Sequence, residues 1–382
     1  MDGSDKKPVG RGMMLITQVV LCLFFGIAGL KYGASVLVPL SLAVLLFVLI
    51  SAIIDRFKAV RLFGHKTPDW LAHVLAFGAV AFGIAIILSI LTSQAAAVND
   101  AFPRYEARFA HIVSQFASLI GDDAFSAAKA GVAEMNLSNL ASGALSSASG
   151  FLSALFLVIL YVAFLMGERA PMRQKLVLAI SDSHTHEKVL TIADSLSNSL
   201  QRYVSIKTFV SILTAVGCYV FMKPVGLDFA ETWAVLAFML NFIPTIGSIL
   251  GVVLPTIVAL VQFDSALPIL VVVFGCGAVQ FTIGNVLEPK ITGRTLNLSP
   301  FLVILSLTFW TAVWGVPGAL MSVPLTVCIM IVLSHIPATR PLAVLMSGDG
   351  YIDGDTAHEQ EAGEGASKMK GHDDVLLQGK AD

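Results

Sequence analysis

The sequence predicts an all-α polytopic integral membrane protein with about six full transmembrane helices and two opposed re-entrant helical hairpins. Of its 382 residues, 56% are hydrophobic and 13% are charged, against about 45–50% and about 25% in soluble domains. Apolar runs near the roughly 20 residues that cross the hydrocarbon core recur along the chain. Two further runs are too long for one crossing and are broken by proline and glycine. This composition excludes a soluble enzyme, a disordered chain and a nucleic-acid-binding protein.

Eight hydrophobic segments are expected in all, and six of them have the length and composition of single crossings. These are residues 13–30, 34–54, 70–92, 151–167, 205–222 and 266–287.

Lysine and arginine counts orient the bundle, because cytoplasmic loops carry an excess of positive charge. With a cytoplasmic N-terminus, the inner segments 1–12, 55–69 and 168–207 hold 13 Lys and Arg, and the outer segments hold five. We therefore expect both termini in the cytoplasm.

The expected organisation has four parts. N-terminal transmembrane helices occupy 1–92, and an extracytoplasmic amphipathic helical segment follows at 93–150. The transmembrane transport region spans 151–346. Residues 347–382 hold nine acidic residues and three lysines with little apolar content, which is typical of a disordered acidic tail.

The two overlong runs are the most informative feature of the sequence. Residues 229–262 are interrupted around Pro244, and residues 299–336 are interrupted around Pro317. Proline removes a backbone donor and glycine tolerates an unwound backbone, so each run is expected to form two half-helices joined by a turn. Such half-helices are short for a crossing but can enter the membrane and return.

One crossing, 266–287, separates the two predicted hairpins, so they would enter the membrane from opposite sides. Secondary transporters use such inverted pairs to place a substrate site near the bilayer midplane. If each long run were instead one continuous crossing, the segment 288–294 with Lys290 and Arg294 would lie outside. Its two positive charges favour the hairpin arrangement.

Three motifs resemble those of the autoinducer-2 exporter (AI-2E) family of bacterial membrane proteins. They are NFIPTIGS from Asn241, GNVLEPKITGRTLNLSP from Gly284 and GVPGALMSVPLT from Gly315. The resemblance covers most of residues 10–340 in hydropathy layout and is specific in motif from about Tyr203 onward. It implies an integral inner-membrane protein that exports small solutes. Thr245 and the acidic tail depart from the family pattern, and the resemblance names no substrate.

Polar residues at the breaks are candidate substrate or ion ligands. The side chains of Asn241, Thr245 and Ser248, with carbonyls freed at Pro244, could bind a solute, or they could simply satisfy the turn. Small residues there permit close helix approach. The candidate positions at the two breaks are Asn241, Pro244, Thr245, Gly247, Ser248, Pro317 and Gly318.

The crossing between the hairpins carries Gln280, Gly284 and Glu288 at four-residue spacing, with Asn285 beside them. Gln280, Asn285 and Glu288 complete the candidate site. Glu288 could carry a proton, or it could lie at the interface and pair with Lys290 or Arg294.

Three other charged residues have simpler explanations. Asp228 and Glu231 suit the capping of the first hairpin helix, and Lys207 suits an interfacial anchor.

Three functions are compatible with these observations. The first is a secondary transporter that exports a small solute, coupled to H⁺ or Na⁺. The second is a sodium or other cation/proton antiporter on the same scaffold. The third is a membrane scaffold or sensor without transport. No nucleophile–base pair, metal motif or nucleotide-binding motif points to an enzyme or a cofactor. The expected partners are the lipid bilayer and a small-molecule or ion substrate, and Gly/Ala-rich helix faces offer surfaces for a homo-oligomer.

Overall fold

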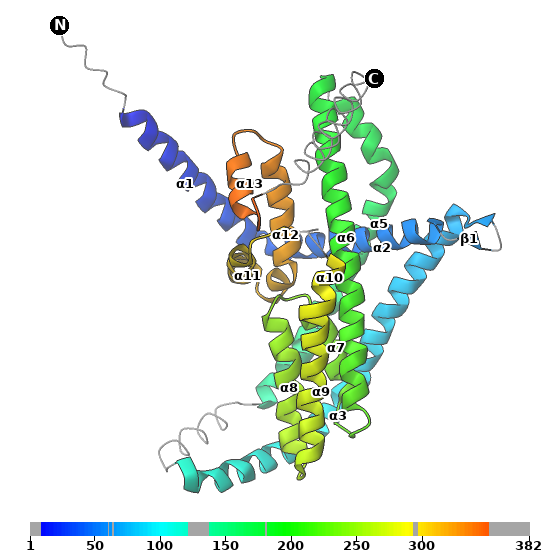
Figure 1. The fold of residues 1–382 in the computed structure, drawn as a ribbon, viewed down its shortest axis with the longest axis vertical. Helices are drawn as coiled ribbons and strands as arrows, with labels where there is room; N and C mark the ends of the chain where they lie inside the picture. Colours follow the sequence, from blue (N-terminus) through cyan, green and yellow to red (C-terminus); the bar gives the residue numbers. More distant parts are fainter. Residues whose placement is uncertain are drawn as a thin grey trace, which may run out of the picture.

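The computed structural model describes residues 9–59, 61–62, 65–120, 137–179, 182–292 and 297–350. Residues 121–136 of the expected amphipathic segment and 351–382 of the expected tail lie outside the described residues. Nearly all of the described chain is helical (Figure 1), apart from two short antiparallel strands, β1 (Arg61–Leu62) and β2 (His65–Lys66). The all-α prediction is confirmed.

The helices follow one another with short connections over most of the described chain. They are α1 (Val9–Tyr32), α2 (Ala34–Ala59), α3 (Asp69–Ile120), α5 (Leu137–Ala179), α6 (Ser183–Met222), α7 (Ala230–Leu240), α8 (Ile246–Gln262), α9 (Ala266–Phe281), the π-helical segment η1 (Thr282–Leu287), α10 (Glu288–Thr292), α11 (Pro300–Trp314), α12 (Val316–Ser334) and α13 (Arg340–Met346).

Within the described residues, five helical segments are long and apolar enough to cross a membrane. Four of them contain predicted crossings, at 34–54, 70–92, 205–222 and 266–287. The fifth is α12, the second half of the second broken run, with 19 residues. The polytopic class is confirmed, and the number of full crossings beside re-entrant hairpins stays a prediction.

Both long runs break where helix-breaking residues cluster. The first run forms α7 and α8 around a turn in which Thr245 has a φ of 61°. The second forms α11 and α12 around Gly315, with a φ of 65°. Pro317 lies in the first turn of α12, where its missing N–H would have had no helical acceptor. In each run the two helices pack against each other.

Two glycines let the hairpin helices approach at the turns. A Cβ at Gly247 would come within 1.8 Å of the Leu240 carbonyl oxygen, and one at Gly318 within 1.9 Å of the Trp310 carbonyl oxygen. Both distances are far inside van der Waals contact. The same close glycine contact therefore recurs in both hairpins.

Helices α7, α8 and α9 run beside one half of α6 and form one bundle (Figure 1). The second hairpin lies beyond the part of α6 that α7, α8 and α9 cover, and there α12 packs on α6 and α2. Buried apolar clusters fill both contact regions, one around Cys218, Met222 and Val272 and another around Val48, Tyr203 and Val327. Because α6 contacts both hairpins, polar groups along it can link them.

Candidate functional site

Helices α6 and α9 pack closely and in antiparallel register. A Cβ at Gly217 of α6 would lie 2.8 Å from Cγ1 of Val279, and one at Gly275 of α9 would lie 2.5 Å from Cγ of Phe221. These two contacts fix which residues of the two helices face each other. For two residues that face each other across this contact, the two residue numbers add to nearly the same value, as expected for antiparallel helices.

A row of buried polar residues follows this contact, and we call it the polar seam. Its members are Lys207, Ser211 and Thr214 on α6, Asn241 at the end of α7, Gln280 on α9 and Glu288 at the start of α10. The three residues of α6 are spaced by four and three, which places them on one helix face. All except Glu288 are at most 8% exposed. Buried polar groups inside an apolar bundle need partners, so their contacts define the site.

Lys207 and Glu288 form an ion pair at one end of the seam, with 2.5 Å between Nζ and Oε1. The interpretation that Glu288 pairs with Lys290 is therefore wrong, and Arg294 lies outside the described residues. Lys207 is not an exposed anchor either, because its side chain is buried. The antiparallel packing of α6 brings the two charges together across 81 residues of sequence.

Asn241 joins the first hairpin to α6. Its side-chain Nδ2 donates a hydrogen bond to Oγ of Ser211 over 3.0 Å, and both residues are buried. Asn241 is also the C-cap of α7, with its backbone N–H bonded to the Ala237 carbonyl. The hairpin turn is thereby tied to the middle of the seam.

Gln280 lies further along the seam, at the level of Thr214. Its side-chain Nε2 is buried and has no hydrogen-bond partner among the described residues. Gly251 of α8 lies against that nitrogen, since a Cβ there would come within 2.5 Å of it. The hydroxyl group of Thr214 donates a hydrogen bond to the carbonyl oxygen of Val210. A buried donor without a partner is costly and often marks a functional group.

The π-helical segment η1 separates Gln280 from Glu288. π-Helical turns occur frequently at functional sites because they widen the helix and shift the residues that follow. The side chain of Asn285 within this segment is exposed and donates to the Phe281 carbonyl. Asn285 therefore does not belong to the seam.

The remaining predicted positions lie at the two hairpin turns. Thr245 is exposed, and Pro244 and Ser248 are half-buried beside it. Pro317 and Gly318 belong to the second hairpin, where Gly318 packs against Trp310. The structure thus brings together Asn241, Gln280 and Glu288 of the predicted set, and Gly247 holds the turn next to Asn241.

Sequence reasoning missed Ser211 and Thr214 and assigned Lys207 to the membrane surface. A signal was present, since these three residues share one helix face within the apolar run 205–222. Single hydroxyl groups in an apolar helix are common, however, because they can bond to their own backbone.

A second cluster of polar side chains, separate from the polar seam, lies at the other end of the bundle. Tyr105 of α3 donates its hydroxyl hydrogen to Oδ2 of Asp228 over 2.7 Å, and Gln262 accepts from the Asp228 backbone N–H. The helix α7 begins after Phe229, which makes no side-chain cap. The capping role expected for Asp228 is therefore wrong, although Glu231 does lie in the first turn of α7. Glu231 also pairs with Lys223.

Burial and the neighbouring carboxylate both affect Tyr105. Burial, the hydrogen bond to Asp228 and the charge of that carboxylate raise the pKa of the phenol well above its usual value. At neutral pH the phenol therefore keeps the hydrogen that binds α3 to the first hairpin. Among the described residues, no group of three His, Cys, Asp or Glu side chains could hold a metal ion.

The known proteins to which this chain is similar are described as transport proteins. The family model described as "AI-2E family transporter" matches residues 19–338. A putative transport protein of Haemophilus influenzae is 30% identical over 343 residues, covering 88% of this chain and 96% of that protein. The AI-2 transport protein TqsA of Escherichia coli K12 is 28% identical, covering 88% of this chain and 94% of that protein.

Proposed function

The chain belongs to the AI-2E transporter family, and on that premise we propose that it is a secondary transporter that exports a small solute across the bacterial inner membrane. The proposed orientation has both termini in the cytoplasm, as the charge distribution of the sequence indicates. Proton or sodium coupling would supply the energy. The fold and the family both describe a membrane protein that works in a lipid bilayer.

The observation that carries this proposal is the polar seam. Six polar side chains on α6, α9, α10 and the end of α7 follow the contact between these helices, and five of them are buried. Polar groups at membrane depth are costly and are commonly kept where they serve a transport pathway. The backbone departs from α-helical geometry at two places next to seam residues, in the turn beside Asn241 and in the π-helical segment that follows Gln280. Such non-helical backbone is typical of transporter sites.

Gln280 gives the sharpest test. Its unpartnered donor costs stability, so Gln280→Met should leave the protein equally or more stable, by about 1–3 kcal/mol. If that donor binds the solute as it passes, transport should fall at the same time. The assay reconstitutes wild-type protein and Gln280→Met in proteoliposomes and screens small solutes with and without proton and sodium gradients.

The matched control is Thr308→Ala, because Thr308 is an exposed residue of α11 whose hydroxyl binds its own helix. Its transport should equal that of the wild type. If Gln280→Met transports at the wild-type rate, the seam at Gln280 is not part of the pathway.

A cation/proton antiporter is the second candidate, and the Lys207–Glu288 pair favours it. A partly buried carboxylate that exchanges a lysine partner for a proton or a sodium ion would serve as a coupling device. Glu288→Gln cannot titrate. In proteoliposomes with an imposed pH gradient, it should abolish cation-driven proton movement while facilitated solute movement persists. Loss of both activities would favour a single coupled pathway, and retention of cation/proton exchange would reject the antiporter.

A further inference from the structure

Helix α3 continues well past its predicted crossing and contacts both ends of the first hairpin. Tyr105 donates its hydroxyl hydrogen to Oδ2 of Asp228 over 2.7 Å, just before α7 begins. Arg108 lies three residues later on the same face of α3 and forms an ion pair with Asp264, shortly after α8 ends. The ring of Tyr105 also meets that of Phe229 edge to face, with 6.4 Å between the centroids. Helix α3 therefore holds the start and the end of one hairpin at once, and we call the Tyr105–Asp228 and Arg108–Asp264 contacts the α3 clasp.

The two ends of the hairpin are also bonded to each other, so its base can move as one body. Oε1 of Gln262 accepts from the backbone N–H of Asp228 over 2.8 Å, and Nε2 of Gln262 donates to the carbonyl oxygen of Gly226 over 2.7 Å. The connection that leads into the base holds Gly226 with a φ of 73° and Phe229 with a φ of 59°. The left-handed conformation is costly for a bulky residue such as Phe229, and strained backbone of this kind is typical of segments that switch between conformations.

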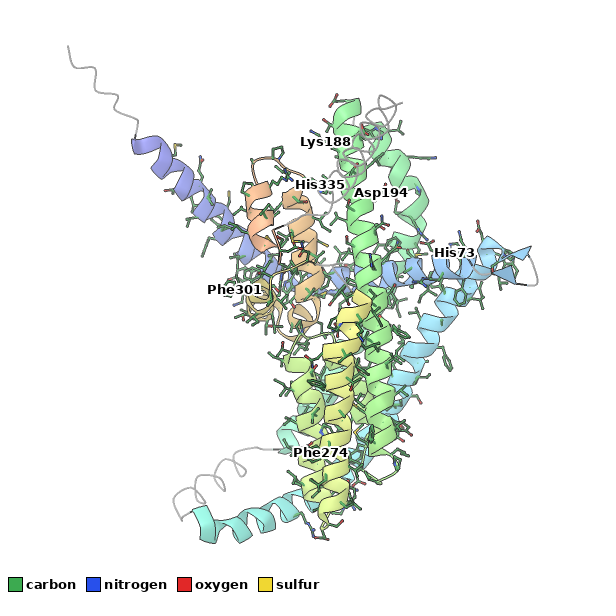
Figure 2. All side chains as sticks on the ribbon, viewed as in Figure 1. His73, Lys188, Asp194, Phe274, Phe301 and His335 are labelled. Atoms are coloured by element: carbon green, nitrogen blue, oxygen red, sulfur yellow. The ribbon has the colours of Figure 1, made fainter. Side chains whose placement is uncertain are left out.

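An apolar cluster lies between the polar seam and the end of the bundle that carries the clasp. It begins one helical turn beyond Thr214 on α6 and ends one turn before Gln280 on α9. Figure 2 shows Phe274 of α9 at this end of the bundle, with Lys188 and Asp194 of α6 at the opposite end. Half of the buried residues of the cluster belong to the first hairpin and to the connection before it, and these are Leu227, Ala230, Ala234 and Ala259. The position of the hairpin base therefore decides whether the seam is closed at this end.

The contacts that hold the hairpin base are easier to break than those that hold its tip. In the clasp, Asp264 is 86% exposed and Arg108 is 37% exposed, and ion pairs this close to water are weak and screened by salt. Most of the residues that the base adds to the apolar cluster are alanines, and a methyl group buries little apolar area. The hydrogen bond from Asn241 to Ser211, by contrast, ties the tip of the hairpin into the buried seam. The base is therefore the part of the hairpin that is free to move.

We propose that the base of the first hairpin is a gate at this end of the polar seam, and that Tyr105 and Arg108 of α3 are the positioning residues that keep it closed. When the clasp is released, the base swings about residues 226–229, away from α6 and α9, and the apolar cluster opens to water. When the gate closes, both bonds of the clasp form again. The passage of a solute through this gate rests on the proposed function, whereas the clasp and the opening of the cluster do not.

Two cysteines report whether the cluster opens, because Cys218 and Cys276 are both fully buried in it. Full-length protein with Cys22→Ser and Cys328→Ser is placed in liposomes with a charged methanethiosulfonate reagent on both sides, and mass spectrometry follows the rate of thiol modification. A charged reagent reaches buried thiols only through water, so this rate measures how often the gate opens. Tyr105→Phe should raise the rate about tenfold, because it removes a hydrogen bond to a carboxylate and keeps the aromatic ring.

The ion pair of the clasp is tested by charge reversal. Arg108→Asp should also raise the modification rate, and the addition of Asp264→Arg should restore the wild-type rate, because the pair is rebuilt with its charges exchanged. Arg104→Gln is the matched control, since Arg104 is an exposed residue of the same helix that forms no ion pair with another described residue. It should leave the rate unchanged. Wild-type rates in Tyr105→Phe and Arg108→Asp would overturn the proposal.

A different cysteine shows whether the effect is local. In a second background Cys328 is kept and the other three cysteines are replaced by serine. Cys328 packs against the separate cluster around Val327, so its modification rate should be the same with and without Tyr105→Phe. An equal rise at Cys328 would mean that the substitution loosens the whole protein, and it would overturn the gate.

Transport is then measured with a solute that the wild-type protein moves in the proteoliposome screen. We expect Tyr105→Phe to release this solute down its own gradient faster than the wild type does, without any ion gradient, because the gate opens more often. A wild-type rate of release together with faster thiol modification would reject the role of the gate in transport. If the wild-type protein moves no solute at all, the proposed function fails, and the modification rates still decide whether the clasp holds the cluster closed.

Discussion

The ammonium nitrogen of Lys207 lies 2.5 Å from a carboxylate oxygen of Glu288 in the interior of the helix bundle. The side chains are 10% and 26% exposed, respectively. A pair that is largely, though not fully, buried gains little net stability from its attraction, since both charges lost much of their hydration. Removal of one partner is far more damaging, because it leaves the other charge buried alone.

Single and double replacements of this pair should therefore differ in the size of their effect on the free energy of unfolding. Lys207→Met and Glu288→Gln should each lower the free energy of unfolding by about 3–5 kcal/mol. The double variant should lie much closer to the wild type, because no uncompensated charge remains. Unfolding of the purified protein in mixed micelles, with increasing denaturing detergent, measures all three.

The exposed pair Lys175–Glu168 is the control, with side chains 58% and 45% exposed. Lys175→Gln should change the free energy of unfolding by about 0–1 kcal/mol. Equal losses from the buried and exposed pairs would contradict the burial that the structure shows.

The glycines of the two hairpin turns give a second prediction. Gly247→Ala and Gly318→Ala each place a methyl group against a backbone carbonyl oxygen. Both should destabilise the protein by about 1–3 kcal/mol or more, because the opposing backbone cannot move aside easily. Thermal unfolding in detergent is the measurement. Gly277→Ala on α9 meets nothing within 4 Å, so it should be neutral or stabilising.

Tyr105 gives a prediction about pH. Its raised pKa means that the hydrogen bond to Asp228 is present at neutral pH and is lost only as the pH rises through that elevated value. In an ultraviolet titration of phenolate formation up to a pH of about 11, Tyr105 should stay protonated, so wild-type protein should form no more phenolate than Tyr105→Phe does. One additional phenolate in the wild type over that range would show that the contact between α3 and the first hairpin is absent.

The hydrogen bond from Asn241 to Ser211 can be measured by a double-mutant cycle. Asn241→Ala leaves a buried hydroxyl without its partner and should lower the free energy of unfolding by about 1–3 kcal/mol. Ser211→Ala should cost a similar amount. The double variant should cost less than the sum, with a coupling energy of about 0.5–3 kcal/mol. Additive losses would mean that the two side chains do not interact.

The sequence by itself determined the class of the protein and the positions of the two helix breaks. Both depend on local properties, since hydropathy reports burial in lipid and the breaks at Thr245 and Gly315 follow from nearby proline and glycine. The sequence also singled out Asn241, Gln280 and Glu288 as candidate site residues, because polar groups stand out in apolar runs.

The tertiary structure alone decided which of these groups meet. Glu288 contacts Lys207 across 81 residues and Asn241 contacts Ser211 across 30, whereas Asn285 points away. Those contacts depend on the antiparallel register of α6 and α9, which is set by small residues such as Gly217 and Gly275 meeting large ones. Such packing joins side chains distant in sequence, and hydropathy does not encode it.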